Sequence, residues 1–424
     1  MAQAQGSKGI VSIQYEESFG VSAAAPNMTK VYFDSEGFKA SRNLVASTII
    51  TGSRNSAIPL LGNIDVQGSL FTELGSNLGM LLHGACGTVK STLLAGTETL
   101  SSPGGALTGA TGVVSGNTLV LTLASGTAHG YVVGDMVTLG ATSGVGSSGD
   151  LAAYRFPVIA VGVWATGSGT VTLRFGAGFT GAVTVVFGNI KKVVPNAAPT
   201  YTHEFKSGGI LPSFAVEKGF TDLPQYFTYN GCRVGKMSLN VAMEGAQKLS
   251  FDFTGKKETL ATTPVDTTIT DLLKKSFVGG DLLAAGIMVG GSVLATITKC
   301  DVSLDNSLDT SIYCLGGGGT RAEITSGSVK VTGTVECLFD SITLYNIAVA
   351  GTESSIKLQF KKGLGDGTVD NEFLEVLIPE LMFKQETPKI SGDKGIMVTL
   401  AFESYASDFT TQLQITLKNS QLAI

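Results

Sequence analysis

The stretch IPLLGNIDVQGSL, residues 58–70, alternates apolar and polar side chains behind a proline. A period of two is typical of a β-strand that buries one face. The polar positions of this strand hold no nucleophile beside a base and no group of metal ligands. The pattern therefore predicts a strand that builds a surface and carries no reaction.

A second copy of this strand lies 265 residues further along the chain. GNIDVQGSL begins at Gly62, GSVKVTGTV begins at Gly327, and both read G-x-[IV]-x-V-x-G-[ST]-[LV]. The stretch TKVYFDSEG from Thr29 precedes the first copy, as TKCDVSLDN from Thr298 precedes the second. Two hairpin-like pairs of alternating runs follow downstream, at residues 232–255 and 379–404. This order predicts a duplicated β-domain, against the alternative that short alternating strands resemble one another by chance.

A short helix is expected behind each copy of the strand. Ser76 is the expected cap of the first helix and Asp340 that of the second. Glycines should end the helices, Gly84 and Gly87 in the first and Gly351 in the second. The expected apolar faces consist of Leu78, Leu81, Leu82 and Ala85 in the first helix, and of Ile342, Tyr345 and Val349 in the second.

Composition favours an all-β fold with short helices. The 424 residues include 55 glycines and only 15% charged residues, and Thr, Val, Ser and Ala are abundant. This mixture suits many short strands joined by tight turns. The length is enough for two or three domains.

We expect one β-domain to be interrupted by another. The Gly-, Thr- and Val-rich residues 102–193 break into short apolar runs with few charges, which predicts a small β-domain inserted in an exposed loop of its host. The expected organisation is a first β-domain in two parts at 1–101 and 194–256, the insert at 102–193, a linker at 257–275 and a second β-domain at 276–424.

Charge and cysteine usage exclude several classes of protein. The net charge is -5 and no run of Lys or Arg exceeds a pair, so specific nucleic-acid binding is not expected. Five scattered cysteines without a CxxC motif indicate buried free thiols made in a reducing compartment. The N-terminus has no apolar signal region, and the longest apolar run, residues 156–164, is too short to cross a membrane.

No catalytic, cofactor-binding or metal-binding residues are predicted. His83, His129 and His203 are isolated from one another in sequence, and we expect a packed or turn role for them. The glycine-rich residues 314–321 lack the ending of a phosphate-binding loop, and residues 363–372 miss the spacing of a calcium loop. The sequence therefore gives no indication of an enzyme.

Three stretches resemble the phage tail tube protein family of long-tailed, siphovirus-like bacterial viruses. They are the early E-x-x-x-G motif ending at Gly20, the GNIDVQGS strand with ELGSNLGMLL behind it, and the YNGCRV strand whose hairpin ends in FDFTGK at Lys256. The resemblance covers roughly the first 255 residues outside the insert, and the C-terminal half matches only through the internal repeat.

The resemblance implies a structural virion protein. Its β-sandwich domains would join strands into a ring-shaped inner β-barrel, and the rings would stack into the tail tube through which the genome leaves for the host. Its partners would be copies of itself, the tape measure protein, and the tail terminator and distal tail proteins. Double-stranded DNA would pass without specific binding, and the protein would be assembled in the bacterial cytoplasm with no membrane contact.

In such a ring, alternation would divide each strand between channel and core. The candidate lumen-facing residues are Asn63, Asp65, Gln67, Ser69, Ser238, Asn240, Glu244, Asp252, Ser328, Lys330, Thr332, Thr399 and Glu403. The candidate core residues are Ile64, Val66, Leu70, Leu239, Val241, Phe251, Phe253, Val329, Val331, Val398, Leu400 and Phe402. The acids among the lumen candidates predict a weakly acidic channel wall, with Lys330 as an exception.

Two domains per chain predict a ring of three chains with pseudo-sixfold symmetry, and six chains are the alternative. Two other functions suit the same composition: a capsid decoration protein, and an adhesive or carbohydrate-binding β-module. The second of these would favour aromatic clusters and a secretion signal, whereas the chain has one tryptophan, Trp164, and no such signal.

Overall fold

The computed structural model describes residues 4–22, 26–50, 52, 54–55, 57–96, 98–101, 110–115, 118–124, 130–139, 142–143, 154–163, 168–174, 183–187, 190–195, 199–289, 292–293, 297–339, 343–388, 395–407 and 411–422. The prediction of an all-β fold is confirmed, because antiparallel strands dominate these residues. Two α-helices lie among them, α1 (Gly79–Cys86) and α2 (Thr343–Ala350), together with short 3-10 turns at Gly6–Lys8 and Gly279–Asp281.

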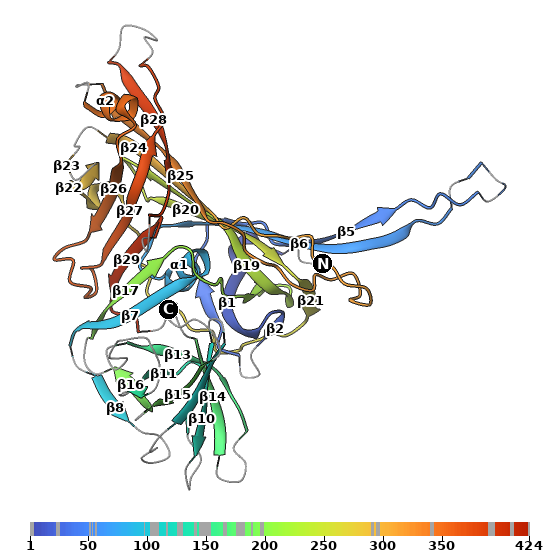
Figure 1. The fold of residues 1–424 in the computed structure, drawn as a ribbon. Coiled ribbons are helices and arrows are strands. Elements are labelled where there is room, and N and C mark those ends of the chain that lie inside the picture. The colour runs from blue at the N-terminus through green and yellow to red at the C-terminus, as the bar shows by residue number, and fades with distance from the viewer. Residues whose placement is uncertain are drawn as a thin grey trace.

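One antiparallel sheet, the long sheet, runs through both halves of the chain (Figure 1). Its order begins with β4 (Ser35–Glu36) and β5 (Lys39–Val45), which pair with β6 (Leu60–Glu73), and continues through β20 (Lys248–Gly255), β19 (Gln225–Ala242), β24 (Ile297–Asp305), β25 (Lys330–Leu338), β28 (Met397–Ser404) and β27 (Phe373–Phe383).

An outer layer packs its apolar side chains against the long sheet in a shared core. Its order is β7 (Thr88–Ala95), β17 (Thr200–Lys206), β29 (Gln414–Asn419), β27, β26 (Ser354–Lys361), β22 (Leu282–Val289) and β23 (Ser292–Val293). A side sheet extends β19 with β3 (Thr29–Val31), β1 (Gly9–Ser18), β2 (Val21–Ser22), β18 (Phe214–Phe220) and β21 (Lys257–Ala261). Strand β21 therefore lies in the segment expected as a linker.

The long sheet contains the same four-stranded unit twice. The first unit has the order β4/β5, β6, β20, β19, and the second has β24, β25, β28, β27. The pairings agree in register, since Leu70 lies opposite Phe251 and Val335, 265 residues after Leu70, lies opposite Leu400. The strand that flanks this pairing, β4 in the first unit and β24 in the second, is aligned differently in the structure than the sequence repeat suggests. Lys299 takes the position of Ser35, so Thr298 corresponds to Asp34 and not to Thr29.

The two units are joined edge to edge. Strand β19 ends the first unit and pairs antiparallel with β24, which begins the second, from Lys236 opposite Asp305 to Ala242 opposite Lys299. We call this pairing the seam. Because it uses ordinary backbone hydrogen bonds, the sheet continues through the seam as it does within each unit.

The second glycine of the repeated motif has the same packing role in both units. Gly68 lies opposite Phe253, and an added Cβ would stand 2.2 Å from the Phe38 ring. Gly333 lies opposite Phe402, whose ring would be 2.4 Å from an added Cβ. An aromatic ring therefore covers each glycine, which accounts for a glycine inside a strand.

Both helices differ in detail from the sequence prediction. Leu78 is the N-cap of α1, and the Ser76 hydroxyl donates to the carbonyl of Leu273 instead. Gly84 lies inside the helix, which ends at Gly87 with φ of 86°. Gly84 fits there because the ring of Phe214 occupies the space that a Cβ would need.

In α2 the buried side chains are Leu344 and Ala348, whereas Val349, expected on the apolar face, is half exposed. The predicted cap Asp340 and Ile342 lie outside the described residues. The sequence placed the apolar face one residue too far along, because short helices carry too few turns to define a stripe.

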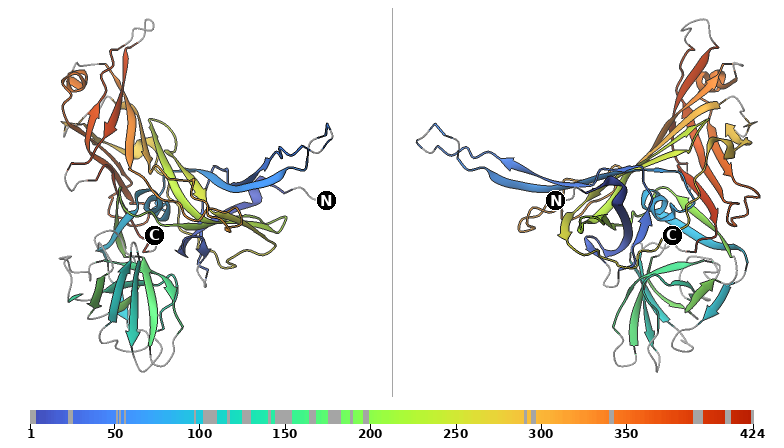
Figure 2. Two further views of the ribbon diagram at one scale, coloured as in Figure 1. Left: turned by 45° about the vertical axis from the view of Figure 1, so that its right-hand side comes forward. Right: turned by 180° about the vertical axis from the view of Figure 1, so that it is seen from behind.

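The strands of the expected insert form a separate sheet with its own core, which hangs below the rest of the molecule in Figures 1 and 2. Their order is β8 (Glu98–Ser101), β16 (Ile190–Pro195), β11 (Met136–Leu139), β13 (Phe156–Val161), β14 (Ser168–Arg174), β10 (Thr118–Ala124), β9 (Ala110–Ser115), β15 (Val183–Phe187) and β12 (Thr142–Ser143). Strand β8 extends this sheet upstream of the expected boundary.

A buried arginine attaches this sheet to the first β-domain. Arg174 is 6% exposed, donates through Nη2 to the carbonyl of Glu16 over 3.1 Å, and lies 4.9 Å from the centre of the Tyr15 ring. The Tyr15 hydroxyl is 2.7 Å from Nδ1 of His83. Burial, with Arg174 nearby, lowers the pKa of His83 to about 3, so this histidine is neutral at pH 7.

The glycine packing gives a direct test of the repeat. Gly68→Ala and Gly333→Ala should each lower the free energy of unfolding by about 1–3 kcal/mol, because the new methyl group overlaps an aromatic ring in a packed core. Gly6→Ala is the control, since nothing lies within 4 Å of its added Cβ. Thermal denaturation of the three variants measures the effect. Equal stability of the Gly68 variant and the control would contradict this packing account.

Candidate functional site

The long sheet presents a polar face that is hollowed at the seam. A groove of about 550 Å³ is lined by side chains of both units, among them Lys236, Ser238, Ser250, Asp301 and Thr334. The opposite face of the same strands is buried in the core. The candidate lumen residues are therefore expected on this polar face.

Cross-strand pairing brings several of the candidates into rows that cross the seam. One row contains Ser69, Asp252, Lys236, Asp305 and Lys330 on successive strands. The next row contains Phe71, Ser250, Ser238, Ser303, Thr332 and Glu403. Residues far apart in the sequence thus form one continuous polar surface.

The other candidates extend these rows or lie beside them. Asn63 and Gln67 are exposed on β6, Asn240 is half-buried on β19, and Thr399 is exposed on β28. Glu244 lies in the turn between β19 and β20, and Ser328 precedes β25, so neither belongs to a strand. The two are exposed.

The candidate core residues are buried with two exceptions. Ile64 and Val329 are partly exposed and pack against the edge of the core. The buried ones are Val66, Leu70, Leu239, Val241, Phe251, Phe253, Val331, Val398, Leu400 and Phe402.

The polar face carries a balance of charges that the sequence analysis missed. Lys236 lies between Asp252 and Asp305, and Lys299 lies opposite Glu336, so oppositely charged side chains are neighbours across strands. Lys248 forms ion pairs with Asp34 at 2.6 Å and Glu73 at 3.8 Å. The expectation of a weakly acidic channel wall stays a prediction, and on this face lysines lie beside several of the acids. Alternation places Lys236 and Lys248 on the same face as the serines beside them, but it does not show which acid each lysine meets.

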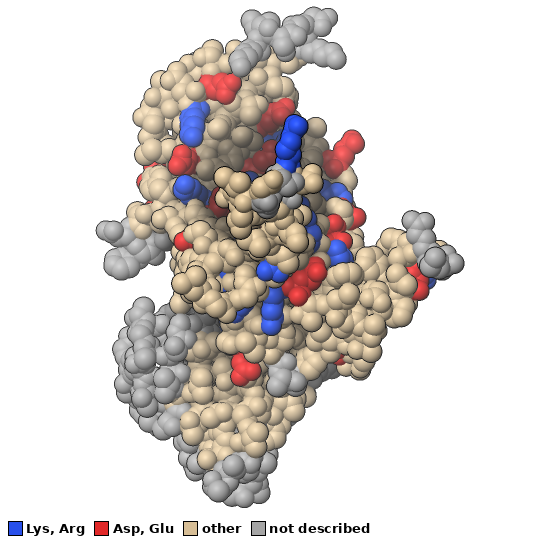
Figure 3. Space-filling view, turned by 90° about the vertical axis from the view of Figure 1, so that its right-hand side faces the viewer, with Lys and Arg blue, Asp and Glu red and all other residues tan. Residues whose placement is uncertain are grey.

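Local contacts also shift the pKa values of two of these groups. Partial burial raises the pKa of Asp252, and neighbouring Lys236 partly offsets this. The hydrogen bond from Lys299 to Asp301 raises the pKa of the lysine. Acids and bases are interspersed over the upper part of the surface in Figure 3, whereas few charged side chains show on the described surface of the lower part, where the insert lies.

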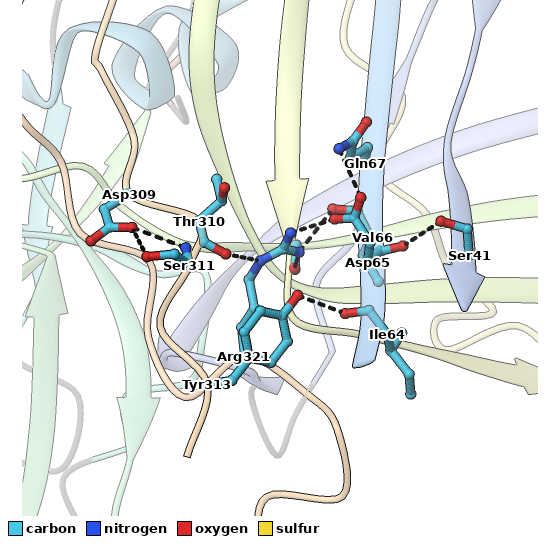
Figure 4. Close-up of polar contacts among 11 residues, drawn as sticks. Ser41, Ile64, Asp65, Val66, Gln67, Asp309, Thr310, Ser311, Tyr313 and Arg321 are labelled. Carbon is cyan, nitrogen blue, oxygen red and sulfur yellow. Dashed lines mark hydrogen bonds and ion pairs between the residues drawn. The ribbon is translucent and has the colours of Figure 1, made fainter. Parts of the chain in front are cut away.

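Asp65 is held by a loop from the second unit. We call residues 306–329, which connect β24 to β25, the clasp. Arg321, 4% exposed, forms an ion pair with Asp65 and donates to the carbonyls of Gly255 at 2.8 Å and Thr310 at 2.8 Å (Figure 4). The Asp65 carboxylate therefore neutralises a buried guanidinium, and it is not a lone charge on the polar face.

Further contacts hold the clasp against the first unit. The Tyr313 hydroxyl donates to the carbonyl of Ile64 at 3.0 Å, and the Ile64 amide donates to the carbonyl of Gly319 at 2.7 Å. The Asn306 side chain donates to the carbonyls of Ala85 and Val234. The glycine-rich stretch 314–321, which lacks the ending of a phosphate-binding loop, is thus hydrogen-bonded to β6.

An arm of two strands leaves the body of the molecule (Figures 1 and 2). It consists of β5, the start of β6 and the described residues between them, and it contains residues 39–62. Its exposed aliphatic side chains are Leu44, Val45, Ile49, Ile50, Ile58, Leu60 and Leu61. Such a concentration of apolar surface on a monomer marks a contact with another chain.

One group in the outer layer brings a serine, a histidine and an asparagine together, but all three are buried. His203 donates through Nε2 to the carbonyl of Gln421 at 3.0 Å, so Nδ1 accepts the hydroxyl proton of Ser91 at 2.8 Å. Asn419 lies 3.0 Å from Nε2. All three side chains are buried, and burial lowers the pKa of His203 to about 4. The group ties β7, β17 and β29 together in the outer layer.

The other motifs weighed for chemistry form turns or core. Asp366 accepts hydrogen bonds from the amide and hydroxyl of Thr368, so the candidate calcium loop 363–372 closes on itself. Four cysteines are buried as expected, but Cys314 is exposed, because it lies in the clasp. Among the described residues, no three His, Cys, Asp or Glu side chains are placed to hold a metal. His129 lies outside the described residues.

Within the described residues, no helix is long and apolar enough to cross a membrane.

Taken together, the doubled sheet unit, the polar face and the apolar arm define a structural β-protein whose recognisable surfaces are suited to contact with other chains. The chain belongs to the phage tail tube protein family, because the model of that family matches residues 6–404. The resemblance found in the sequence is thereby confirmed and extended through the second half of the chain. The protein is a structural component of a phage tail. No match was found among curated proteins.

The clasp predicts a large effect from one arginine. Arg321→Met should lower the free energy of unfolding by about 1–3 kcal/mol, because four buried or half-buried acceptors, the Asp65 carboxylate and the carbonyls of Val66, Gly255 and Thr310, lose their donor. It should also make residues 306–329 more sensitive to limited proteolysis. Arg42→Met is the matched control, since Arg42 makes one exposed hydrogen bond to Gly62 on the same sheet. Indistinguishable melting temperatures and cleavage patterns for the two variants would refute the role of Arg321.

Proposed function

We propose that three copies of this chain close into a ring and that stacked rings form the tube through which the viral genome leaves. The observation that carries the proposal is the seam, where two equivalent four-stranded units continue one sheet edge to edge. A unit that pairs with its own copy at one edge has the geometry to repeat around an axis. With two units in each chain, three chains supply the six units of a pseudo-sixfold ring.

The hollowed polar face is proposed as the channel wall. Its short polar side chains and paired charges offer neither a cluster of cations to hold phosphates nor a strong field to repel them. Double-stranded DNA would pass without specific binding. The covered apolar face would lie outward, under the outer layer.

The arm and the insert are proposed to have different roles. The exposed aliphatic side chains of the arm would bind a copy in the neighbouring ring, which would bury them. The insert shares no strand of the long sheet, so it would project from the outside of the tube. We propose no enzymatic activity for either part.

The wider setting follows the family. We propose a siphovirus-like tail assembled in the bacterial cytoplasm, with the tape measure, tail terminator and distal tail proteins as partners. We propose the domain organisation expected from the sequence with two changes: the insert runs from Glu98 to Pro195, because β8 and β16 pair in its sheet, and the first domain also includes β21, which pairs with β19. The second domain is proposed at 276–424, as expected.

Native mass spectrometry of rings released from purified tubes tests the number of chains. We expect a mass of three chains, because each chain supplies two ring units. A mass of six chains would mean that the second unit does not enter the ring, even if tubes form.

Two deletions test the arm against the insert. Replacing residues 98–195 with a Gly/Ser linker should leave tube formation intact, with a lower melting temperature because Tyr15 and His83 lose Arg174. Replacing residues 46–59 with an Asn-Gly turn should give rings that do not stack. Electron microscopy distinguishes the products. Long tubes formed by the chain without residues 46–59 would contradict the role of the arm in stacking. A folded chain without the insert that forms no tubes would contradict the position of the insert outside the tube wall.

A further inference from the structure

The seam supplies a template for the contact between two copies. It joins the last strand of the first unit to the first strand of the second. In a ring, the last strand of the second unit, β27 with the residues that follow it, would meet the first strand of the first unit, β4/β5, in another copy. Within the described residues, β5 has β6 as its strand partner, and β28 lies on one side of Phe383 and Lys384.

Comparing cross-strand partners in the two units shows which residues at the β27 edge of the second unit are equivalent to residues of β19 in the first. Phe253 and Phe402 are equivalent because each lies opposite the motif glycine. Lys236 lies opposite Asp252, and the Lys384 amide donates to the carbonyl of Ala401 at 2.7 Å. Lys384 therefore occupies the position of Lys236, and Glu386 occupies that of Ser238.

The same procedure gives the equivalents at the other edge. Lys330 in the second unit is equivalent to Asp65 in the first. Asp65 lies opposite Ser41 on β5, and Lys330 lies opposite Asp305 on β24. Ser41 is therefore equivalent to Asp305, and Lys39 is equivalent to Ser303. In the seam, Ser238 lies opposite Ser303.

From these equivalences we infer that residues 383–386 of one copy pair antiparallel with residues 39–42 of a second copy, with Glu386 facing Lys39. The inference rests on the proposed ring and specifies its joint between chains. Lys384 would face Ser41 in the same register, as Lys236 faces Asp305 in the seam.

The backbone groups at both edges fit this register. Because the Lys384 amide points to β28, alternation directs the amides and carbonyls of Phe383 and Gln385 outward. On the other edge, the Gly37 amide donates to Ser69 on β6, which directs the groups of Ala40 and Arg42 outward. Gln385 would then pair with Ala40, and Phe383 with Arg42.

The pairing has a defined end at Phe38. The Phe38 amide donates to the carboxylate of Glu36, and its carbonyl accepts from Lys218 at 2.9 Å and Tyr229 at 3.2 Å. These bonds occupy the backbone groups that a longer ladder would need. The joint between copies is thus shorter than the seam, where pairing extends over seven residues of β19, from Lys236 to Ala242.

The change from serines in the seam to an ion pair at the joint has a physical reason. The seam is closed within the chain, whereas the two outer edges must stay apart until the correct partner arrives. Charged side chains discourage the pairing of a free edge with an identical one, since Lys39 would meet Lys39 or Glu386 would meet Glu386. Opposite charges favour only the head-to-tail arrangement that closes a ring.

A disulfide tests the register. Lys39 and Glu386 would form a non-hydrogen-bonded pair, with Cα atoms about 4.5 Å apart, which a disulfide can bridge. We combine K39C and E386C with C314S, which removes the exposed native thiol. Assembled tubes should give reducible multimers under a mild thiol oxidant, ending at three chains. The control K39C/K384C/C314S, two residues out of register, should give about tenfold less.

The possible outcomes distinguish an error in the inferred register from a failure of the proposed ring. If tubes form and the two cysteine variants cross-link equally, the register is wrong although the ring proposal stands. If the unmodified chain forms no rings or tubes, the proposed function fails. If the cysteine variants do not assemble, the charge pair decides: K39E and E386K should each reduce tube yield, and K39E/E386K should restore it. Absence of this rescue would overturn the pairing of Lys39 with Glu386.

Discussion

The structure depends on the pairing of β19 with β24. This seam turns two separate four-stranded units into one sheet, because the backbone groups left free at the edge of the first unit are satisfied by the second. An unpaired edge exposes amides and carbonyls and invites uncontrolled association. Duplication with a seam therefore removes half of the edges that separate single units would expose. It also makes half of the proposed contacts around a ring intramolecular, where the linked strand is present at high effective concentration.

The remaining contacts keep the two units in their relative positions. The C-terminal strand β29 pairs with β17 of the first half and β27 of the second, so the outer layer is also continuous. The clasp crosses the seam on another side and inserts Arg321 beside Asp65. These contacts are distributed over several strands, and the groove at the seam is lined by both units.

Much of this arrangement can be read from the sequence, because it depends on short-range patterns. Alternation identified the strands, and the motif glycines identified the repeat, since Gly68 and Gly333 each make room for an aromatic ring. The sequence did not predict the partners of those strands. The pairing of Arg321 with Asp65 joins residues that no local pattern connects, and Lys236 and Lys248 went unnoticed because strand alternation alone does not show which charges become neighbours. The prediction that Ser76 caps α1 was wrong for a related reason, since its hydroxyl donates to the carbonyl of Leu273, which is distant in the sequence.

The central claim is that both units of each chain build the wall of the tube. A reconstruction of assembled tubes by electron cryo-microscopy, at a resolution that separates strands, tests it most directly. The account predicts a wall in which first and second units alternate around the channel, joined by β19 and β24 within each chain, with the polar faces of both units inward. A wall made of first units alone, with residues 276–424 on the outside of the tube, would contradict it.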